Sequence, residues 1–257
     1  MNDPVLWSDA RCGHPRAPEP SGAAGSFATP VTVLSPTRGL VAAHHPLGAS
    51  TGMWARARGD WRLLAELAVE TSSFAAELAA LDESELDGLL AYLASEPDLP
   101  HRYLSVHGPS KGRALPEAEL VERLGSLPGW VDAIVLHPDT LAEPAAYEPL
   151  GDRLVLENLD ARKASGRTAA ELAPLFDALP EAGFCLDVAH VSSVDPTMAV
   201  GEDLLDAFGG RLRHVHVSSL DREGCHAPLR DEDEERFCPL LSRCIDVPWI
   251  LEAPLPG

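Results

Sequence analysis

Carboxylates and imidazoles stand at the ends of successive apolar runs from residue 102 onward. Both side chains bind divalent metal ions, and both can move protons. The chain has 10 histidines in all, so their recurrence at the ends of these runs exceeds what scatter would produce. The candidates are His107 in SVHGPS, His137 in VLHPD, Glu157 in LENLD, Asp187 and His190 in LDVAH, His216 in HVHVSS, His226 in the following loop, and Glu252 in LEAP.

Two of these candidates are carboxylates that directly follow strongly apolar sequence. Glu157 comes after VL, and Glu252 comes after WIL. A buried anion is costly unless a cation or strong hydrogen-bond donors compensate it. We therefore expect Glu157 and Glu252 to be functional residues.

The elements that must position the candidates are short apolar runs that alternate with helical patterns. This alternation is typical of βα units with parallel strands, and eight runs predict a closed TIM-type (β/α)8 barrel. Because the carboxyl ends of barrel strands surround one pocket, the candidates are expected to converge there. The predicted strands span residues 38–45, 72–80, 102–108, 130–138, 152–158, 183–190, 211–219 and 247–253.

Apolar spacing of three or four residues predicts helices over 59–70, 82–95, 116–127 and 168–179. Two of them begin with a capping-box pattern, Asp82 with Glu85 and Thr168 with Glu171. The acidic run at 231–235 is expected to open another helix, because negative charge is favourable at a helix N-terminus.

The two ends of the chain lie outside this alternation. Residues 1–28 are rich in Pro, Gly and Ala, so they are expected to form a flexible leader before one barrel domain over 29–257. The sequence ends a few residues after the eighth run, so the last outer helix is expected to be missing. The leader, or a second subunit of a homo-oligomer, could cover that flank.

The composition of the chain limits the kinds of molecule it is expected to bind and the compartment in which it is expected to lie. The chain has 40 acidic against 20 basic residues, and its net charge of −20 argues against a nucleic-acid partner and leaves a small-molecule substrate. No signal-peptide pattern is present, and no stretch approaches the roughly 18 apolar residues that cross a bilayer. The 5 cysteines form no CxxC pair, and their odd number suits a reducing, cytoplasmic location.

The motifs resemble the xylose isomerase-like superfamily of TIM barrels, which includes sugar isomerases and epimerases, inosose dehydratases and endonuclease IV. The resemblance covers roughly residues 38–253. The epimerase branch implies one metal ion held by Glu157, Asp187, His216 and Glu252. The DxxH motif implies that His190 faces substrate or a second metal. Endonuclease IV-like members hold three zinc ions, which implies that His107, His137 and His226 are further ligands.

The sequence departs from the endonuclease IV pattern at two places. Gly224 stands where the DxH motif has its aspartate, two residues before His226. A third metal would therefore lose a ligand, and Asp221 could replace it only through a different loop path. The motif after the fifth run reads ENLD instead of ENTAG, although the Glu-Asn pair is kept.

The ligand set is compatible with several metals. Carboxylates with imidazoles suit Mn²⁺, Mg²⁺, Zn²⁺, Co²⁺ or Fe²⁺, with one ion expected and two or three allowed by the additional histidines. Cys185 and Cys225 are expected to fill space and not to bind metal.

Four functions follow from one such site. The leading prediction is a metal-dependent isomerase or epimerase of a sugar-like metabolite. In it Glu157 and Glu252 transfer protons on opposite faces, and His190 contacts a substrate hydroxyl or phosphate. The main alternative is a multinuclear metal-dependent phosphoester hydrolase acting on a small phosphorylated molecule. A multinuclear iron oxidase and a binding protein without catalysis are the remaining alternatives.

Overall fold

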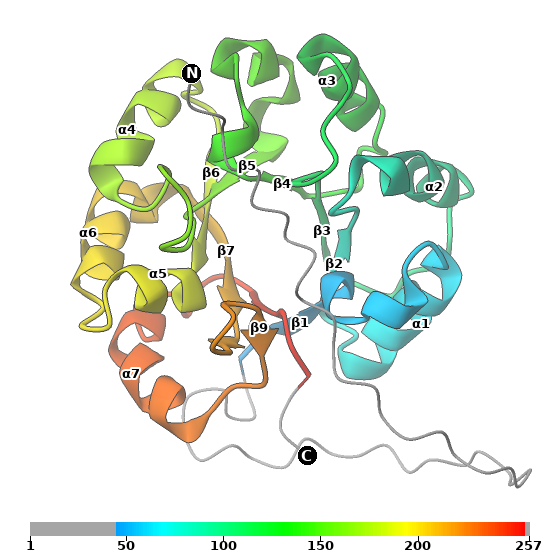
Figure 1. The fold of residues 1–257 in the computed structure, drawn as a ribbon. Coiled ribbons are helices and arrows are strands. Elements are labelled where there is room, and N and C mark those ends of the chain that lie inside the picture. The colour runs from blue at the N-terminus through cyan, green and yellow to red at the C-terminus, as the bar shows by residue number, and fades with distance from the viewer. Residues whose placement is uncertain (1–44, 255–257) are drawn as a thin grey trace, which may run out of the picture.

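Alternating apolar runs and helices fold into a closed barrel in the computed structural model, which describes residues 45–254. Its parallel strands follow the order β1-β10-β7-β6-β5-β4-β3-β2. Figure 1 shows the strands at the centre and the helices around them. The barrel strands are β1 Leu47–Ser50, β2 Ala75–Ala79, β3 Tyr103–His107, β4 Ala133–Leu136, β5 Leu154–Glu157, β6 Gly183–Asp187, β7 Leu212–Val217 and β10 Trp249–Leu251.

Helices follow most strands and cover the outside of the barrel. The α-helices are α1 Trp61–Thr71, α2 Glu83–Ala94, α3 Glu117–Gly125, α4 Ala169–Ala178, α5 Val188–Val194, α6 Ala199–Phe208 and α7 Asp231–Leu241. The 3-10 helices are η1 Thr51–Met53, η2 Ala55–Ala57, η3 Pro138–Thr140, η4 Pro144–Arg153 and η5 Gly209–Arg211. After β7, the short strands β8 Ser219–Leu220 and β9 His226–Ala227 pair as an antiparallel hairpin. None of the described residues after β10 is helical.

Local sequence accounts for where these helices begin. The capping boxes predicted at Asp82 and Thr168 are both formed, with Glu85 and Glu171 at the third helical position. The acidic run opens α7 as predicted. After β4 the chain forms η4 in place of an α-helix, and prolines at the start and in the interior of this segment disfavour α-helical hydrogen bonding.

Seven of the eight predicted strands are confirmed in position. The barrel closes through β1 at Leu47–Ser50, whereas the first strand was predicted at 38–45, of which residues 38–44 lie outside the described part of the chain. β1 was missed because its sequence, LGAS, has little apolar character. Its glycine is required, since a Cβ at Gly48 would lie 2.5 Å from Ile250 Cδ1 and 2.8 Å from Ala75 Cβ.

Two of the predicted strands, 183–190 and 211–219, extend past the ends of β6 and β7, because α5 begins directly after Asp187 and β7 ends at Val217. His190 therefore lies on a helix and not on a strand. The predicted leader, residues 1–28, and the domain boundary that follows it lie outside the described residues. No helix among the residues described is long and apolar enough to cross a membrane.

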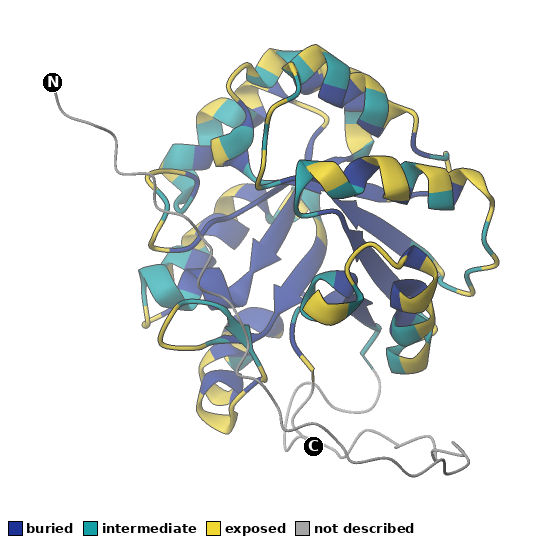
Figure 2. Ribbon diagram, turned by 45° about the vertical axis from the view of Figure 1, so that its right-hand side comes forward, coloured by how far each residue is buried: buried dark blue, intermediate teal, exposed yellow. Residues whose placement is uncertain are grey.

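The two faces of the barrel strands have different surroundings. Residues such as Leu78, Leu156 and Leu186 belong to the large apolar cluster shared with the helices. Their sequence neighbours point to the other face because side chains alternate along a strand. Figure 2 shows the buried strands enclosed by helices whose outer surfaces are exposed. The small apolar cluster inside the barrel consists of Ala133, Val135, Val155 and Cys185, with Tyr103 packed against it.

Candidate metal centre

Strand register brings distant residues to one end of the barrel. Asp187 on β6 pairs with His216 on β7, and His216 pairs with Ile250, two residues before Glu252. Glu157 ends β5, beside Cys185 of β6. Because the strands are parallel, these side chains share the mouth formed by their carboxyl ends. The structure brings all eight predicted ligands into three overlapping groups.

The central group consists of Glu157, Asp187, His216 and Glu252. One ligand atom of each lies within 4.8 Å of the others. The Nδ1 of His216 lies 3.3 Å from Glu157 Oε1 and 3.4 Å from Glu252 Oε1. Three carboxylates and one imidazole around a common point suit a hard or borderline divalent cation.

The strand 3–4 group adds His107 and His137 to Glu157. The Nε2 atoms of both histidines approach the same oxygen, Glu157 Oε2, at 3.2 and 3.3 Å. The other ring nitrogen of His107, Nδ1, is 2.9 Å from the Gly108 carbonyl oxygen. When Nδ1–H donates to that carbonyl, Nε2 is left with a lone pair for a metal.

The hairpin group consists of Asp187, His190 and His226. The Nδ1 of His190 is 2.9 Å from the backbone oxygen of Asn158, which leaves its Nε2 available as a ligand. His226, on β9, has its Nδ1 2.8 Å from Ser218 Oγ and 3.3 Å from Glu252 Oε2.

The hairpin explains the missing aspartate of the DxH motif. Gly224 has a φ of 78°, and a Cβ there would lie 3.0 Å from the Arg162 guanidinium. Any other residue would therefore be strained and crowded at this position. Asp221 does not replace the missing ligand, because its Oδ1 accepts hydrogen bonds from the backbone N–H groups of Glu223 and Cys225. Three residues make up the hairpin group.

Asn158, beside Glu157 in the ENLD motif, fixes the strand that carries Asp187. Its side-chain Nδ2 donates to the Asp187 carbonyl at 3.0 Å, and its Oδ1 accepts from the Asp187 N–H at 2.8 Å. Asp187 in turn caps α5, since its Oδ1 accepts from the His190 N–H at 2.7 Å. The Glu-Asn pair therefore ties β5, β6 and α5 together at the mouth.

The electrostatics of the centre show an excess of crowded carboxylates. Burial raises the pKa of Glu157, but the imidazoles of His216 and His137 outweigh it and hold the pKa well below its usual range. Burial also raises the pKa of Glu252 well above its usual value, and the Asp187 carboxylate adds to this effect. Two neighbouring carboxylates with opposite pKa shifts indicate that the histidines do not neutralise all of them.

Three buried atoms of the groups have no hydrogen-bond partner. They are Asp187 Oδ2, Glu252 Oε2 and His137 Nδ1. The two carboxylate oxygens lie 3.4 Å from His190 Nδ1 and 3.3 Å from His226 Nδ1, but neither contact is a hydrogen bond. An unpaired buried polar atom is unfavourable, and in native proteins it calls for an explanation such as a bound ion. The two carboxylate oxygens belong to the central group, so a divalent cation there would satisfy both. The residues present therefore fit a metal ion.

The sequence analysis missed Glu77, which lies in the middle of β2 and is fully buried. Its Oε2 is 3.2 Å from His216 Nε2. Burial raises the pKa of Glu77, but His216 and His107 outweigh it and lower the pKa to about 2. The available signal was the sequence AAELA, in which a lone glutamate interrupts a run of small apolar residues.

Cys185 and His214 also lie beside the centre, on the inward face one step below it. The Cys185 thiol is fully buried, and this burial raises its pKa far above the usual value. The expectation that Cys185 fills space agrees with its place in the interior apolar cluster. His214 Nδ1 is 2.7 Å from the Tyr103 hydroxyl.

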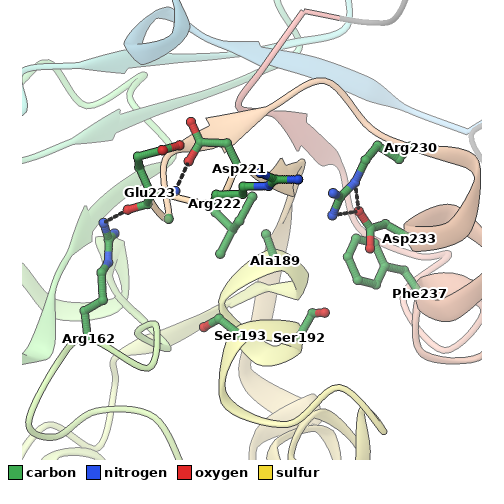
Figure 3. Close-up of a pocket in the computed structure, with 12 residues that line it drawn as sticks. Arg162, Ala189, Ser192, Ser193, Asp221, Arg222, Glu223, Arg230, Asp233 and Phe237 are labelled. Atoms are coloured by element: carbon green, nitrogen blue, oxygen red, sulfur yellow. Dashed lines mark hydrogen bonds and ion pairs between the residues drawn. The ribbon is translucent and has the colours of Figure 1, made fainter. Parts of the chain in front are cut away.

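A cavity of about 310 Å³ lies beside the centre, between α5, the β8–β9 hairpin and the start of α7. Figure 3 shows Ser192 and Ser193 on one side, Asp221 to Glu223 opposite, and Arg230 with Asp233 at one end. None of the eight candidate ligands lines this cavity. Its Arg230 is paired with Asp233 at 2.6 Å, so the guanidinium charge is already balanced.

Known proteins share this fold at low sequence identity. A solved D-psicose 3-epimerase, determined in the presence of D-fructose, is 16% identical over 82% of this chain and 86% of that chain, with a TM-score of 0.52. An apo 3-keto-D-glucoside 4-epimerase from E. coli is 12% identical over 83% of this chain and 94% of that chain, with a TM-score of 0.48. A xylose isomerase domain-containing protein from Salmonella typhimurium LT2 is 14% identical over 80% and 87%, with a TM-score of 0.45.

No protein-family model matches the sequence, and no curated protein sequence matches it. The structural likeness and the closed parallel barrel confirm the architecture expected from the strand-end motifs. The chain therefore shares a closed parallel β/α barrel fold with the solved D-psicose 3-epimerase.

Proposed function

We propose that this protein is a multinuclear divalent-metal-dependent hydrolase that cleaves a phosphoester of a small molecule. The observation that carries the proposal is the sharing of Glu157 and Asp187 between adjacent ligand groups. Carboxylates that belong to two groups are suited to bridge neighbouring ions. When bound, such ions supply an activated water and stabilise charge on the phosphoryl group and the leaving oxygen.

The contacts of Glu157 support this proposal over proton transfer by the same residue. Its Oε2 is approached by His107 and His137, and its Oε1 by His190 and His216, all at 3.2–3.3 Å. A general base needs an oxygen that faces the proton it removes. With both oxygens occupied, Glu157 is better suited to hold ions than to abstract a proton.

Glu252 is the carboxylate best placed to exchange protons with a substrate. Its side chain is 12% exposed, whereas those of Glu157 and Asp187 are 1% and 0% exposed. Burial raises its pKa well above the usual value, so Glu252 holds a proton more readily than an exposed carboxyl does. Its oxygens also lie 3.4 Å from His216 Nδ1 and 3.3 Å from His226 Nδ1, so its greater exposure and its raised pKa are what favour Glu252 as proton donor or acceptor.

The net charge of −20 supports a small substrate over a polynucleotide. A polynucleotide requires a basic surface along its backbone, because affinity depends on neutralised phosphates. A small phosphorylated molecule needs contact with the metal centre alone.

A second candidate is an isomerase or epimerase of a sugar-like metabolite. The central group alone favours it, since one ion held by Glu157, Asp187, His216 and Glu252 is sufficient to polarise a substrate carbonyl. The fold is shared with a D-psicose 3-epimerase, but fold likeness does not choose between chemistries. In this alternative His190 contacts a substrate hydroxyl, and His107 and His137 hold no ion.

Metal content per chain separates the two candidates. The protein is purified without chelator or nickel resin and measured by elemental mass spectrometry, beside the variants Glu157→Gln, His107→Ala and His101→Ala. We expect two or three ions in the wild type, one fewer in His107→Ala, and at most one in Glu157→Gln. His101 is the control, because it lies two residues before β3 and contacts the Ser72 carbonyl.

Product analysis then tests the chemistry. Zinc- or manganese-loaded protein is expected to release phosphate from small phosphoesters without incorporating solvent deuterium into sugars. A single ion retained in His107→Ala, together with deuterium exchange at a sugar carbon, would replace the hydrolase with the isomerase. Bound iron with oxygen consumption would replace it with the oxidase.

A further inference from the structure

Glu77 is a fully buried carboxylate one layer below the metal centre. It lies on β2 between Ser50 of β1 and Ser105 of β3, which are its register partners. Ser50 Oγ donates to its Oε1 at 3.2 Å, and Ser105 Oγ donates to its Oε2 at 3.0 Å. Two serine hydroxyls from adjacent strands therefore hold the carboxylate in one orientation.

Glu77 faces the inner side of a candidate ligand. Its Oε2 is 3.2 Å from His216 Nε2, whereas the other ring nitrogen, Nδ1, is 3.3 Å from Glu157 Oε1 in the central group. A neutral imidazole carries one proton, so its two nitrogens have different roles. An Nε2–H that donates to Glu77 leaves the Nδ1 lone pair directed at the mouth.

We infer that Glu77 is a positioning residue that fixes the ring orientation and the tautomer of His216 for metal binding. This inference rests on the proposed metal-dependent function. Glu77 touches no substrate, because it is fully buried and its contacts are Ser50, Ser105 and the histidines of β7. Carboxylates that accept the second N–H of a metal-binding histidine raise the affinity of the site for its metal.

The same contacts argue against a separate metal site deeper in the barrel. Cys185, His214 and His216 also bring their ligand atoms within 4.8 Å of one another. An ion there would need a nitrogen of His216, and both nitrogens already have partners, Nε2 in Glu77 and Nδ1 in Glu157 of the central group. The cluster is therefore better explained as the support of His216.

The test compares Glu77→Gln with Asp233→Asn. Both variants replace a buried, hydrogen-bonded carboxylate by its amide, but Asp233 contacts Ser219, Arg230 and Arg236 and none of the candidate ligands. Zinc affinity is measured by competition with a chromophoric chelator, and folding by circular dichroism. We expect Glu77→Gln to bind zinc about 10–100-fold more weakly, with Asp233→Asn close to wild type.

A second readout does not depend on metal or on the variant. Long-range ¹H–¹⁵N correlation spectra of the metal-free wild type, recorded while the pH is raised until the His216 ring is neutral, are expected to show that the ring keeps its proton on Nε2 and loses the one on Nδ1. Protonation at Nδ1 alone, or unchanged zinc affinity in a folded Glu77→Gln, would overturn the positioning role. A wild type that binds no zinc but has the Nε2–H tautomer would instead refute the proposed function and leave the Glu77–His216 pair standing.

Discussion

The outward and inward faces of the same barrel strands have different roles, apolar packing on the outward face and candidate metal binding on the inward face. On β5, Leu156 packs into the apolar cluster shared with the helices, and its neighbour Glu157 joins two ligand groups. On β2, Leu78 and Glu77 divide in the same way. Stability is therefore concentrated on one face of the strands and chemistry on the other. Substitutions one residue apart are expected to affect different properties.

The largest expected effect is on the inward face, at Glu157. Replacing it with Gln removes the carboxylate shared by the central and strand 3–4 groups, so activity is expected to fall to the level of metal-free protein. Steady-state assays with added metal measure this. The matched control is Glu148→Gln on the exposed surface of η4, and equal activity in the two variants would remove Glu157 from the centre.

Substitutions on the outward face are expected to lower the free energy of unfolding and to leave metal binding unchanged. Phe184 on β6 packs against Phe176 and Phe208, with ring centroids at 6.2 and 5.9 Å. Phe184→Ala is expected to lower the free energy of unfolding by about 3–5 kcal/mol, because it leaves a cavity. Denaturant unfolding measures the loss, with Leu63→Ala, on a side chain that is 40% exposed, as the control. Metal content per folded chain should stay unchanged. A loss of metal would contradict the assignment of stability to the outward face and metal binding to the inward face.

Metal bound at the inward face is expected to stabilise the whole fold, including the apolar outward face, because it binds the folded state only. A ligand that binds only the folded state stabilises it, by about 2.7 kcal/mol at a free concentration 100-fold above its dissociation constant. Zinc is therefore expected to raise the free energy of unfolding of the wild type by this amount. Glu157→Gln should show little of the increase. Equal stabilisation of both proteins would place the bound zinc elsewhere.

The smallest expected effect is a difference in unfolding free energy between two variants of Asp187, whose side chain both caps a helix and belongs to the central group. Asp187 caps α5 through Oδ1 and leaves Oδ2 for the central group. Asp187→Asn should keep the cap and lose metal, whereas Asp187→Ala should lose both, at a further cost of about 1 kcal/mol in unfolding free energy. Paired unfolding and zinc-binding curves measure this, and equal stability of the two variants would show that the cap contributes nothing.

Much of the fold could be predicted because outward residues follow the apolar alternation. The exceptions have physical causes. β1 contains Gly48, whose close contacts with Ile250 and Ala75 replace side-chain bulk, so no apolar run marks the strand. α5 begins directly after the last residue of β6, so no turn between them marks the boundary in the sequence.

The ligands of the centre other than His226 were visible in the sequence because each ends or follows an apolar run, whereas His226 was found through the resemblance to the DxH motif. Glu77 was overlooked, since it lies inside β2 and its only mark in the sequence is a lone glutamate among small apolar residues. Its role depends on the register with Ser50 and Ser105 and on the distance to His216, which pairing across strands decides. The missing hairpin ligand was visible as Gly224, but the use of Asp221 in the turn was not.

The double use of Asp187 has a consequence for how this protein can diverge. Asparagine and serine cap a helix about as well as aspartate, but neither carries the charge that a cation requires. A descendant that no longer binds metal can therefore replace Asp187 with asparagine or serine and still have a capped α5. A descendant that binds metal needs aspartate at this position. Among relatives, the residue at position 187 should then distinguish lineages that retain the chemistry from those that retain the barrel alone.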